Sequence, residues 1–442
     1  MNDNPLSFPH TLIYLKQIMS AHSDVTKRFL LATKRAEINA LQLVASNCQV
    51  VTTVSELIHQ LQKERGISNI FLSSANRRFE QEHKDQIDRG IQAEELLRSQ
   101  LKAKYLHSDD ISNNMRLLNT ITLALQGLDY ISTLRYKVQK QELTALQSMQ
   151  AYNQLIKGLL SVVFEAADVG SDPSIAKILV ALFNFIQGKE YAGQERATGA
   201  LGFSKSMFDQ SLCESLSQLQ QAQTDSFTTF EEFASNQENT MWHSLQGKDT
   251  NKQLQQMRTM MQQLADGSAI SSEISEVWYE LTTHRIDAMR AIEEQLTSRL
   301  LEVAQQRVEQ ADKELSEHKK RVNKLAATSP LSTELTLDMV LDVSAENIPK
   351  AYNSQLNDLA DNSLYDLLRE QSENIKKMTS ELELAKQAIA EQKTINRAKL
   401  LLMQQLKYNE SQAHRALQKQ AMDQKVSLAE MARLVIKASG SK

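Results

Sequence analysis

Apolar residues recur at alternating steps of three and four from about residue 50 to about residue 300, interrupted only by short polar turns. Such steps place the apolar side chains on one face of a helix, whereas a half-buried strand needs an apolar residue at every second position. Turn-forming residues are also scarce, with 12 glycines and 5 prolines in 442 residues. The chain is therefore predicted to be all-α, and long amphipathic helices joined by short turns are typical of antiparallel bundles.

Short polar stretches mark where the predicted helices end. The N-terminal region is expected to hold a short helix and a connection at residues 23–24. Further breaks are predicted at residues 108–110, 170–173, 188 and 247–251, where Gly, Pro, Asp, Asn and Ser gather.

Arg65 interrupts one of the apolar stripes. Helical spacing places it on one face together with Val54, Leu57, Leu61, Ser68 and Leu72. A guanidinium held against a core needs an anionic partner, because it does not lose its proton. The adjacent Glu64 points to a different face. Another helix therefore brings a carboxylate, or the partner is a bound anion.

Three more arginines occupy similar positions. Arg285 lies in the stripe of Trp278 and Ile292, Arg196 lies among small residues, and Arg135 follows a third stripe. A stripe arginine by itself commonly reaches outward or meets a carboxylate. Several in one bundle, however, can clamp a small planar oxyanion through paired N–H donors. Nitrate, nitrite, bicarbonate and carboxylates all have the shape that such a clamp accepts.

Two heptad stretches follow the predicted bundles. The first runs from Leu301 to Leu325, and the second from Ile375 to Ile389. Heptads with polar residues elsewhere indicate a coiled coil or a signalling helix. Two such seams favour a parallel homodimer, although each seam could pack within its own chain instead.

The C-terminal end is basic. Residues 386–442 hold 11 Lys and Arg against 4 Asp and Glu, so this segment carries +7 while the chain carries −4. Three short helices are expected here, the third capped by Ser427 with Glu430 three residues later. A basic end on an acidic body predicts a module that binds a polyanion, although a solvated helical tail has the same composition.

The sequence also limits the classes of function. Two cysteines are too few for a disulfide framework, and no apolar stretch is long enough for a membrane span. We therefore expect a soluble cytoplasmic protein without a membrane partner. We find no phosphate-binding glycine loop, metal set or nucleophile–base pair, so we expect no enzyme, no cofactor and no metal.

Three motifs stand out over about residues 50–300: the segment 61–68 with Phe71 and Leu72, the segment 189–197, and Trp278 with Thr283, Ile286 and Asp287. Together they resemble the motifs of the nitrate- and nitrite-sensing (NIT) domain. The resemblance implies an all-helical sensor of two packed bundles that binds nitrate or nitrite through arginines. Carried over by motif, the ligand candidates are Arg65, Arg285 and Arg196.

The C-terminal end has three further motifs, in the segments 395–403, 411–413 and 417–422. They resemble those of the ANTAR domain, an RNA-binding antiterminator module. The chain departs from the family pattern at Leu400 and Gln418, where the family has Gly and Arg. The resemblance implies RNA binding, with Arg397, Lys399, Arg415 and Lys419 as candidate contacts. Unpaired loops are the usual targets of sequence-specific RNA readers, because their bases are accessible.

Together these observations predict four regions: an N-terminal helical extension at 1–49, an anion sensor at 50–300, a helical or coiled-coil linker at 301–384, and a small three-helix RNA-binding bundle at 385–442. The expected function is transcription antitermination in response to nitrate or nitrite. Anion binding would release the basic modules of a homodimer to bind leader-RNA stem-loops and block terminator formation. Two alternatives remain open: an anion-sensing protein that regulates a partner protein, and an anion-sensing regulator that binds DNA.

Overall fold

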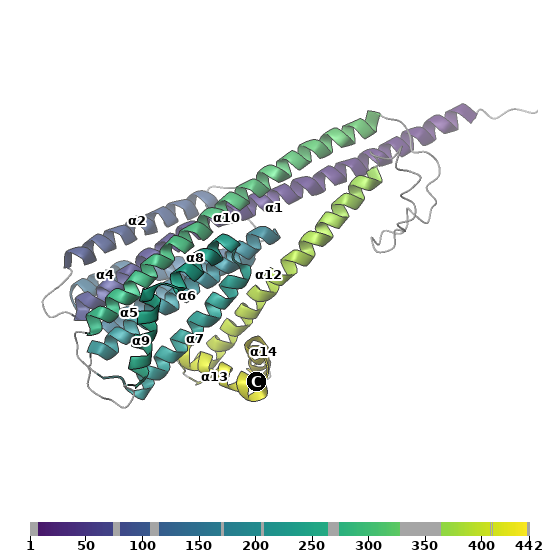
Figure 1. Ribbon diagram of the computed structural model, residues 1–442. Coiled ribbons are helices and arrows are strands. Elements are labelled where there is room, and N and C mark those ends of the chain that lie inside the picture. Colours follow the sequence, from purple (N-terminus) through teal and green to yellow (C-terminus); the bar gives the residue numbers. More distant parts are fainter. Residues whose placement is uncertain are drawn as a thin grey trace, which may run out of the picture. The chain divides into compact units, whose positions relative to one another are not determined.

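The computed structural model describes residues 8–73, 80–106, 115–168, 172–204, 207–263, 274–327, 364–406, 408 and 410–439. Every regular element in these ranges is a helix (Figure 1), as the spacing of the apolar residues predicts. The helices are α1 (Phe8–Ser73), α2 (Glu80–Tyr105), α3 (Met115–Asp129), α4 (Ile131–Gln139), α5 (Ala145–Asp168), α6 (Pro173–Ser204), α7 (Gln210–Phe233), α8 (Asn236–Gln246), α9 (Asp249–Gln263), α10 (Ile274–Ala327), α12 (Leu364–Leu406), α13 (Glu410–Gln424) and α14 (Leu428–Ser439).

Contacts divide the chain into two compact units. One comprises Met1–Ala45 and Ala304–Glu381, and the other comprises Ser46–Val303 and Leu382–Lys442. Three long helices, α1, α10 and α12, contribute residues to both units.

In the first unit, the seam at the end of α10 packs against α1. Ala311 and Leu315 of α10 form a buried cluster with Ile38 and Leu41 of α1. Lys34 adds an ion pair to Glu314 at 3.4 Å. The described part of the first heptad stretch therefore packs within its own chain, which is one of the two arrangements that the sequence left open. Residues 328–363, which belong to the predicted linker, lie outside the described residues.

Helix α6 forms the centre of the second unit. The start of α6 is buried on almost every side, from Ile175 through Ile186. A helix that is apolar all round belongs in a core, because it has no polar face for solvent. It packs against α5 and α7, and Asp172 caps its N-terminus by accepting from the N–H of Ser174 and Ile175. The predicted break at 170–173 is thus confirmed, with Pro173 at the first helical position.

Two other predicted breaks are wrong. Residues 23–24 lie inside α1, because Ser and Asp without Gly or Pro leave the helical hydrogen bonds intact. Gly188 lies inside α6, where a Cβ would meet the ring of Phe227 at 2.7 Å. This glycine therefore makes room for an aromatic ring of α7 and does not end a helix. The break at 247–251 is confirmed, between α8 and α9, while residues 108–110 lie outside the described ranges.

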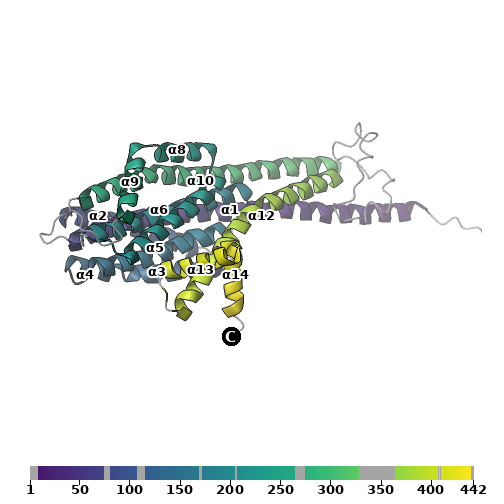
Figure 2. The ribbon, with the colours of Figure 1, turned by 60° about the horizontal axis from the view of Figure 1, so that its bottom comes forward.

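The C-terminal end of the second unit is a small three-helix bundle (Figure 2). The end of α12 contributes Ala398 and Leu402 to its core, α13 contributes Leu417, and α14 contributes Met431. Ser427 caps α14 by accepting from the Glu430 N–H at 3.1 Å, as the sequence predicts. The apolar spacing at the end of the chain thus builds a core of its own.

Candidate functional site

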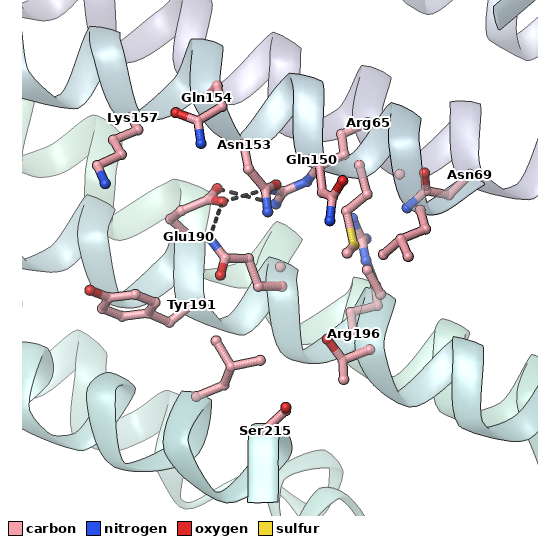
Figure 3. Close-up of a pocket in the computed structure, with 18 of the residues that line it drawn as sticks. Arg65, Asn69, Gln150, Asn153, Gln154, Lys157, Glu190, Tyr191, Arg196 and Ser215 are labelled. Carbon is pink, nitrogen blue, oxygen red and sulfur yellow. Dashed lines mark hydrogen bonds and ion pairs between the residues drawn. The ribbon is translucent and has the colours of Figure 1, made fainter. Parts of the chain in front are cut away.

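Arg65 is buried in the middle of the apolar stripe on α1. The side chains of Val54, Leu57 and Leu61 are at most 1% exposed, and Arg65 itself is 1% exposed. Its guanidinium donates to both carboxylate oxygens of Glu190 on α6 and to the side-chain oxygen of Asn153 on α5 (Figure 3). A helix distant in sequence therefore supplies a carboxylate to Arg65.

Glu190 is held by more than this arginine. Its carboxylate also accepts from Gln62 Nε2 and from Gln194 Nε2, each at 2.9 Å. Glu190 is 2% exposed, and its bonds with Arg65 and Gln62 are buried. Three side chains with N–H donors thus converge on a planar group that carries one negative charge.

Arg196 is a second buried arginine, and it lacks such a carboxylate. Within the described ranges, no carboxylate oxygen lies within 4.0 Å of its guanidinium, although the residue is only 7% exposed. It donates to the Thr283 hydroxyl at 3.0 Å and lies 5.0 Å from the centre of the Tyr279 ring. Burial lowers the pKa of Arg196, and the charge of Arg65 adds to this effect. Arg196 is thus a desolvated cation whose contacts are a hydroxyl and a ring face.

Two glycines bring the two arginines together. A Cβ on Gly193 of α6 would lie 2.6 Å from Arg65 Nη2, and a Cβ on Gly66 of α1 would lie 2.7 Å from Arg196 Nη2. Each helix therefore omits a side chain where the arginine of the other helix passes. Trp278 fixes the local backbone, since its indole N–H donates to the Arg196 carbonyl at 2.9 Å.

Arg65 and Arg196 line two cavities. The smaller, of about 290 Å³, is also lined by His59, Lys189, Tyr279 and Thr283. The larger, of about 1210 Å³, is drawn in Figure 3, and it is also lined by Asn153, Glu190 and, from the C-terminal bundle, Lys399. Both arginines therefore reach spaces that can admit a small anion.

A second buried ion pair lies beside the smaller cavity, whose lining includes Lys189 and His59. Lys189 of α6 is 1% exposed and donates to Glu293 of α10. Its Nζ lies 3.4 Å from His59 Nδ1. Burial, followed by the charge of Lys189, lowers the pKa of His59 to about 2, so this imidazole is neutral. The positive charge of Lys189 is thus balanced by a carboxylate.

Glu64, the neighbour of Arg65, belongs to a separate buried network. Arg135 of α4 donates to both its oxygens, at 2.8 and 2.9 Å, and the Tyr152 hydroxyl donates to one of them at 2.7 Å. Burial and then the charge of Glu64 raise the pKa of Tyr152 well above its usual value. Glu64 thus faces away from Arg65, as helical geometry predicts, and Arg135 has a structural partner.

Arg285 lies on α10 in a different cluster. It donates to Gln223 Oε1 at 3.0 Å and lines neither of the two cavities described above. Gln223 also bonds to Glu195, which Arg258 holds through both carboxylate oxygens. Burial and then the charge of Arg258 lower the pKa of Arg285 to about 10. Arg285 is therefore linked to Glu195, the neighbour of Arg196, and its direct contact with an anion stays a prediction.

The four predicted RNA contacts are not equally accessible. Arg397 and Lys419 are exposed, whereas Lys399 is 6% exposed and lines the larger cavity. Arg415 is exposed too, and it forms an ion pair with Glu214 of α7. Lys393, which the sequence did not single out, pairs with Glu165 of α5 at 3.3 Å.

Sequence reasoning missed the roles of Glu190 and Asn153. Glu190 lies in the segment 189–197 that carries the family resemblance, but nothing in its spacing identifies it as the partner of Arg65. Asn153 has no local signal, because its contact comes only from the packing of α5 on α1.

Two further properties concern the described residues as a whole. In these ranges, no group of three or more His, Cys, Asp or Glu is placed to hold a metal ion. None of the helices they form is long and apolar enough to cross a membrane.

Comparisons with known proteins agree with this architecture. The family model for nitrate and nitrite sensing (NIT) matches residues 56–301, and the ANTAR domain model matches residues 383–436. A nitrate regulatory protein from Klebsiella oxytoca is 29% identical over 404 residues, which cover 91% of this chain and 92% of that protein. The solved structure of the NasR transcription antiterminator matches with a TM-score of 0.55 and 25% identity, covering 98% of this chain and all of that one.

Proposed function

Because the chain belongs to the nitrate- and nitrite-sensing family and carries an ANTAR domain after the sensor, we propose that it is a nitrate- or nitrite-responsive transcription antiterminator. The relatives named above are a nitrate regulatory protein and a transcription antiterminator, which supports this proposal. Both matched families are regulatory, so the proposed protein signals and does not catalyse.

The observation that carries the proposal is Arg196. A buried cation that forms no ion pair is costly, because burial removes its hydration, and the more distant charges of Asp287 and Glu190 only partly oppose the lowering of its pKa. A monovalent planar anion between Arg196 and Arg65 would supply that charge and accept the paired N–H donors of a guanidinium. We therefore place nitrate or nitrite against these two arginines, with the Thr283 hydroxyl as a third donor.

Arg285 would act on this site through its neighbours. Gln223 connects it to Glu195, which adjoins Arg196 in α6. In this role Arg285 is a positioning residue, and its loss would weaken anion binding less than the loss of Arg196.

The basic side chains of the C-terminal bundle support a repressed ligand-free state. Lys393 and Arg415 pair with the sensor carboxylates Glu165 and Glu214, and Lys399 is buried. An RNA backbone needs these same cations, because phosphate contacts provide most of the affinity. We propose that anion binding weakens these contacts and so releases the bundle for a leader-RNA stem-loop, whose exposed loop bases it would read.

The test is RNA binding by the purified full chain, measured by filter binding on leader RNA with and without nitrate or nitrite. We expect tighter binding with the anion, and no anion effect for Arg196→Met. Equal RNA affinity in both conditions would refute direct regulation. Duplex DNA of the same sequence serves as competitor, and effective competition by it would point to a DNA-binding regulator.

A matched pair of variants tests the repressed state separately. Glu214→Gln removes the carboxylate that holds Arg415, so ligand-free RNA affinity should rise by about two- to fivefold, the range expected for an exposed ion pair. Glu232→Gln removes an exposed carboxylate from the same helix and should change nothing. A rise in both variants would reflect net charge alone and would contradict the specific contact.

We also propose that the protein works in the cytoplasm, because its proposed RNA target is a nascent transcript, and that it forms a homodimer. Ile375, at the start of the second heptad seam, is 52% exposed, whereas Leu382, Ala385 and Ile389 further along it are buried, so the start of the seam is the part open to a partner chain. Sedimentation velocity with and without nitrate would test this, and a monomer in both conditions would contradict it.

A further inference from the structure

The carboxylate of Glu190 occupies the face of Arg65 that a planar anion would need. Arg65 uses both of its terminal nitrogens on Glu190, with 3.1 Å between Nη2 and Oε2, and Nη1 also donates to Asn153. A carboxylate and a nitrate or nitrite ion present the same edge, two oxygens on one planar centre, to a guanidinium. The two groups therefore compete for the same donors.

The surroundings of Glu190 fit this replacement. Gln62 and Gln194 each donate one N–H to it, so three donor side chains already point at a planar monovalent anion. Gly193 leaves the space through which Arg65 reaches this carboxylate. Arg196, in contrast, forms no ion pair within 4.0 Å in the described ranges and lines the same two cavities as Arg65.

We propose that Glu190 is a built-in competitor: its carboxylate stands in for the ligand on Arg65, and a planar oxyanion binds by displacing it. This inference rests on the proposed function and specifies how the anion affinity of that site is set. With Glu190 in place, the two arginines and the carboxylate carry a net charge of +1, so the site still attracts an anion. Displacement of Glu190 then changes what holds α6 against α1, which a ligand added beside an intact ion pair would not do.

If Glu190 instead oriented Arg65 for the ligand, the predicted change in anion affinity would have the opposite sign. A Glu190 that stays in place would orient Arg65 for the ligand, and its removal would weaken anion binding. A competing Glu190 lowers the affinity, so its removal strengthens binding. The sign of the change therefore separates the two roles.

The experiment is calorimetric titration of the full chain with sodium nitrate, comparing the wild type with Glu190→Gln. The variant keeps the size of the side chain but removes the charge that pairs with Arg65. We expect the Kd for nitrate to fall at least tenfold, which corresponds to about 1.4 kcal/mol. An unchanged or higher Kd would overturn the proposal.

Glu64→Gln is the matched control. Glu64 is also a fully buried carboxylate paired with an arginine, it adjoins Arg65, and it lines neither cavity. This substitution changes the net charge by the same amount as Glu190→Gln, but it frees no hydrogen-bond donor of Arg65. The Kd for nitrate should therefore stay within about threefold of the wild-type value. Equal tightening in both variants would show a general charge effect and would contradict competition at Arg65.

Glu190→Asp keeps the proposal testable if the glutamine variant does not fold. The shorter side chain retains the charge but withdraws the carboxylate by one methylene, so nitrate should again bind more tightly. Weaker binding would indicate an orienting role and would overturn the proposal. The wild type separates this inference from the proposed function: absence of nitrate and nitrite binding there would refute the anion site itself, whereas binding without tightening in the variants would refute only the competitor.

Discussion

Arg65 and Arg196 should respond differently to the same substitution, because among the described residues Arg65 forms an ion pair and Arg196 forms none. Arg65→Met removes the cation that pairs with Glu190 and leaves this buried carboxylate with amide donors alone. Breaking a buried ion pair on one side costs about 3–5 kcal/mol, mostly through the charge that remains. We expect the free energy of unfolding of the sensor to fall by that amount.

Arg196→Met should cost far less. It removes one hydrogen bond to Thr283 and the contact with the Tyr279 ring, which together contribute about 2–3 kcal/mol. It also removes a desolvated cation, and this relief offsets part of the loss. We therefore expect the net loss of stability to stay below about 2–3 kcal/mol and to be smaller than that of Arg65→Met.

Urea unfolding followed by tryptophan fluorescence provides the assay. The chain has two tryptophans, Trp242 and Trp278, and both are buried in the second unit at 2% and 0% exposure. Nitrate at about 100 times its Kd should stabilise the wild type by about 2.7 kcal/mol, and it should stabilise neither arginine variant.

Two results would refute this reasoning. A loss of stability in Arg196→Met as large as in Arg65→Met would mean that Arg196 is a structural cation. Stabilisation of Arg196→Met by nitrate would mean that the anion binds elsewhere. As a control, the double variant Arg65→Met with Glu190→Met should recover most of the stability, because an apolar pair leaves no buried charge behind.

Three further outcomes follow from the buried groups around the site. His59, whose pKa falls to about 2 on folding, takes up a proton below about pH 6.5 only when the chain unfolds. Stability is therefore lost as the pH falls, by about 2 kcal/mol at pH 5. In urea titrations at pH 7 and pH 5, His59→Gln should remove this pH-dependent part of the free energy of unfolding. The control His284→Gln, which changes an exposed histidine, should retain it. Gly193→Ala should raise the nitrate Kd at least tenfold in calorimetry, because the added Cβ would lie 2.6 Å from a nitrogen of Arg65; an unchanged Kd would place the anion away from this guanidinium. Tyr152→Phe should lower the free energy of unfolding by about 2 kcal/mol, since it removes a buried donor to an ionised carboxylate. A loss under about 0.5 kcal/mol would mean that this bond adds little.

The sequence predicted the face of each helix better than the partner of each side chain. Helical spacing alone placed Arg65 on a buried stripe and turned Glu64 away from it, and both predictions are confirmed. The identity of the partner was not predictable, because Glu190 lies 125 residues away and meets Arg65 only through the packing of α6 on α1. Periodicity is a local property, whereas an ion pair between helices depends on the fold.

Glycine was the least reliable sequence signal for the end of a helix, because its role also depends on the packing of distant helices. Gly188 reads as a turn in the sequence, yet it lies within α6 where a ring of α7 needs the space. Gly193 and Gly66 likewise serve close approach between helices. A glycine inside an otherwise helical pattern therefore marks a crossing as readily as an end, and only the neighbouring helix distinguishes the two.

Two neighbouring contacts between α1 and α5 indicate which helices should move when Glu190 is displaced. On α1, Glu64 accepts from Tyr152 of α5, and Arg65 donates to Asn153 of the same helix. An anion that replaces Glu190 leaves the first of these contacts untouched, so α1 and α5 stay joined while α6 loses its ion pair to α1. A ligand shifts an equilibrium only through contacts that differ between two states, and this ion pair is such a contact. Movement should therefore occur between α6 on one side and α1 with α5 on the other. Helix α7 packs on α6 and carries Glu214, the carboxylate that pairs with Arg415, so it is the helix best placed to transmit this movement to the RNA-binding bundle.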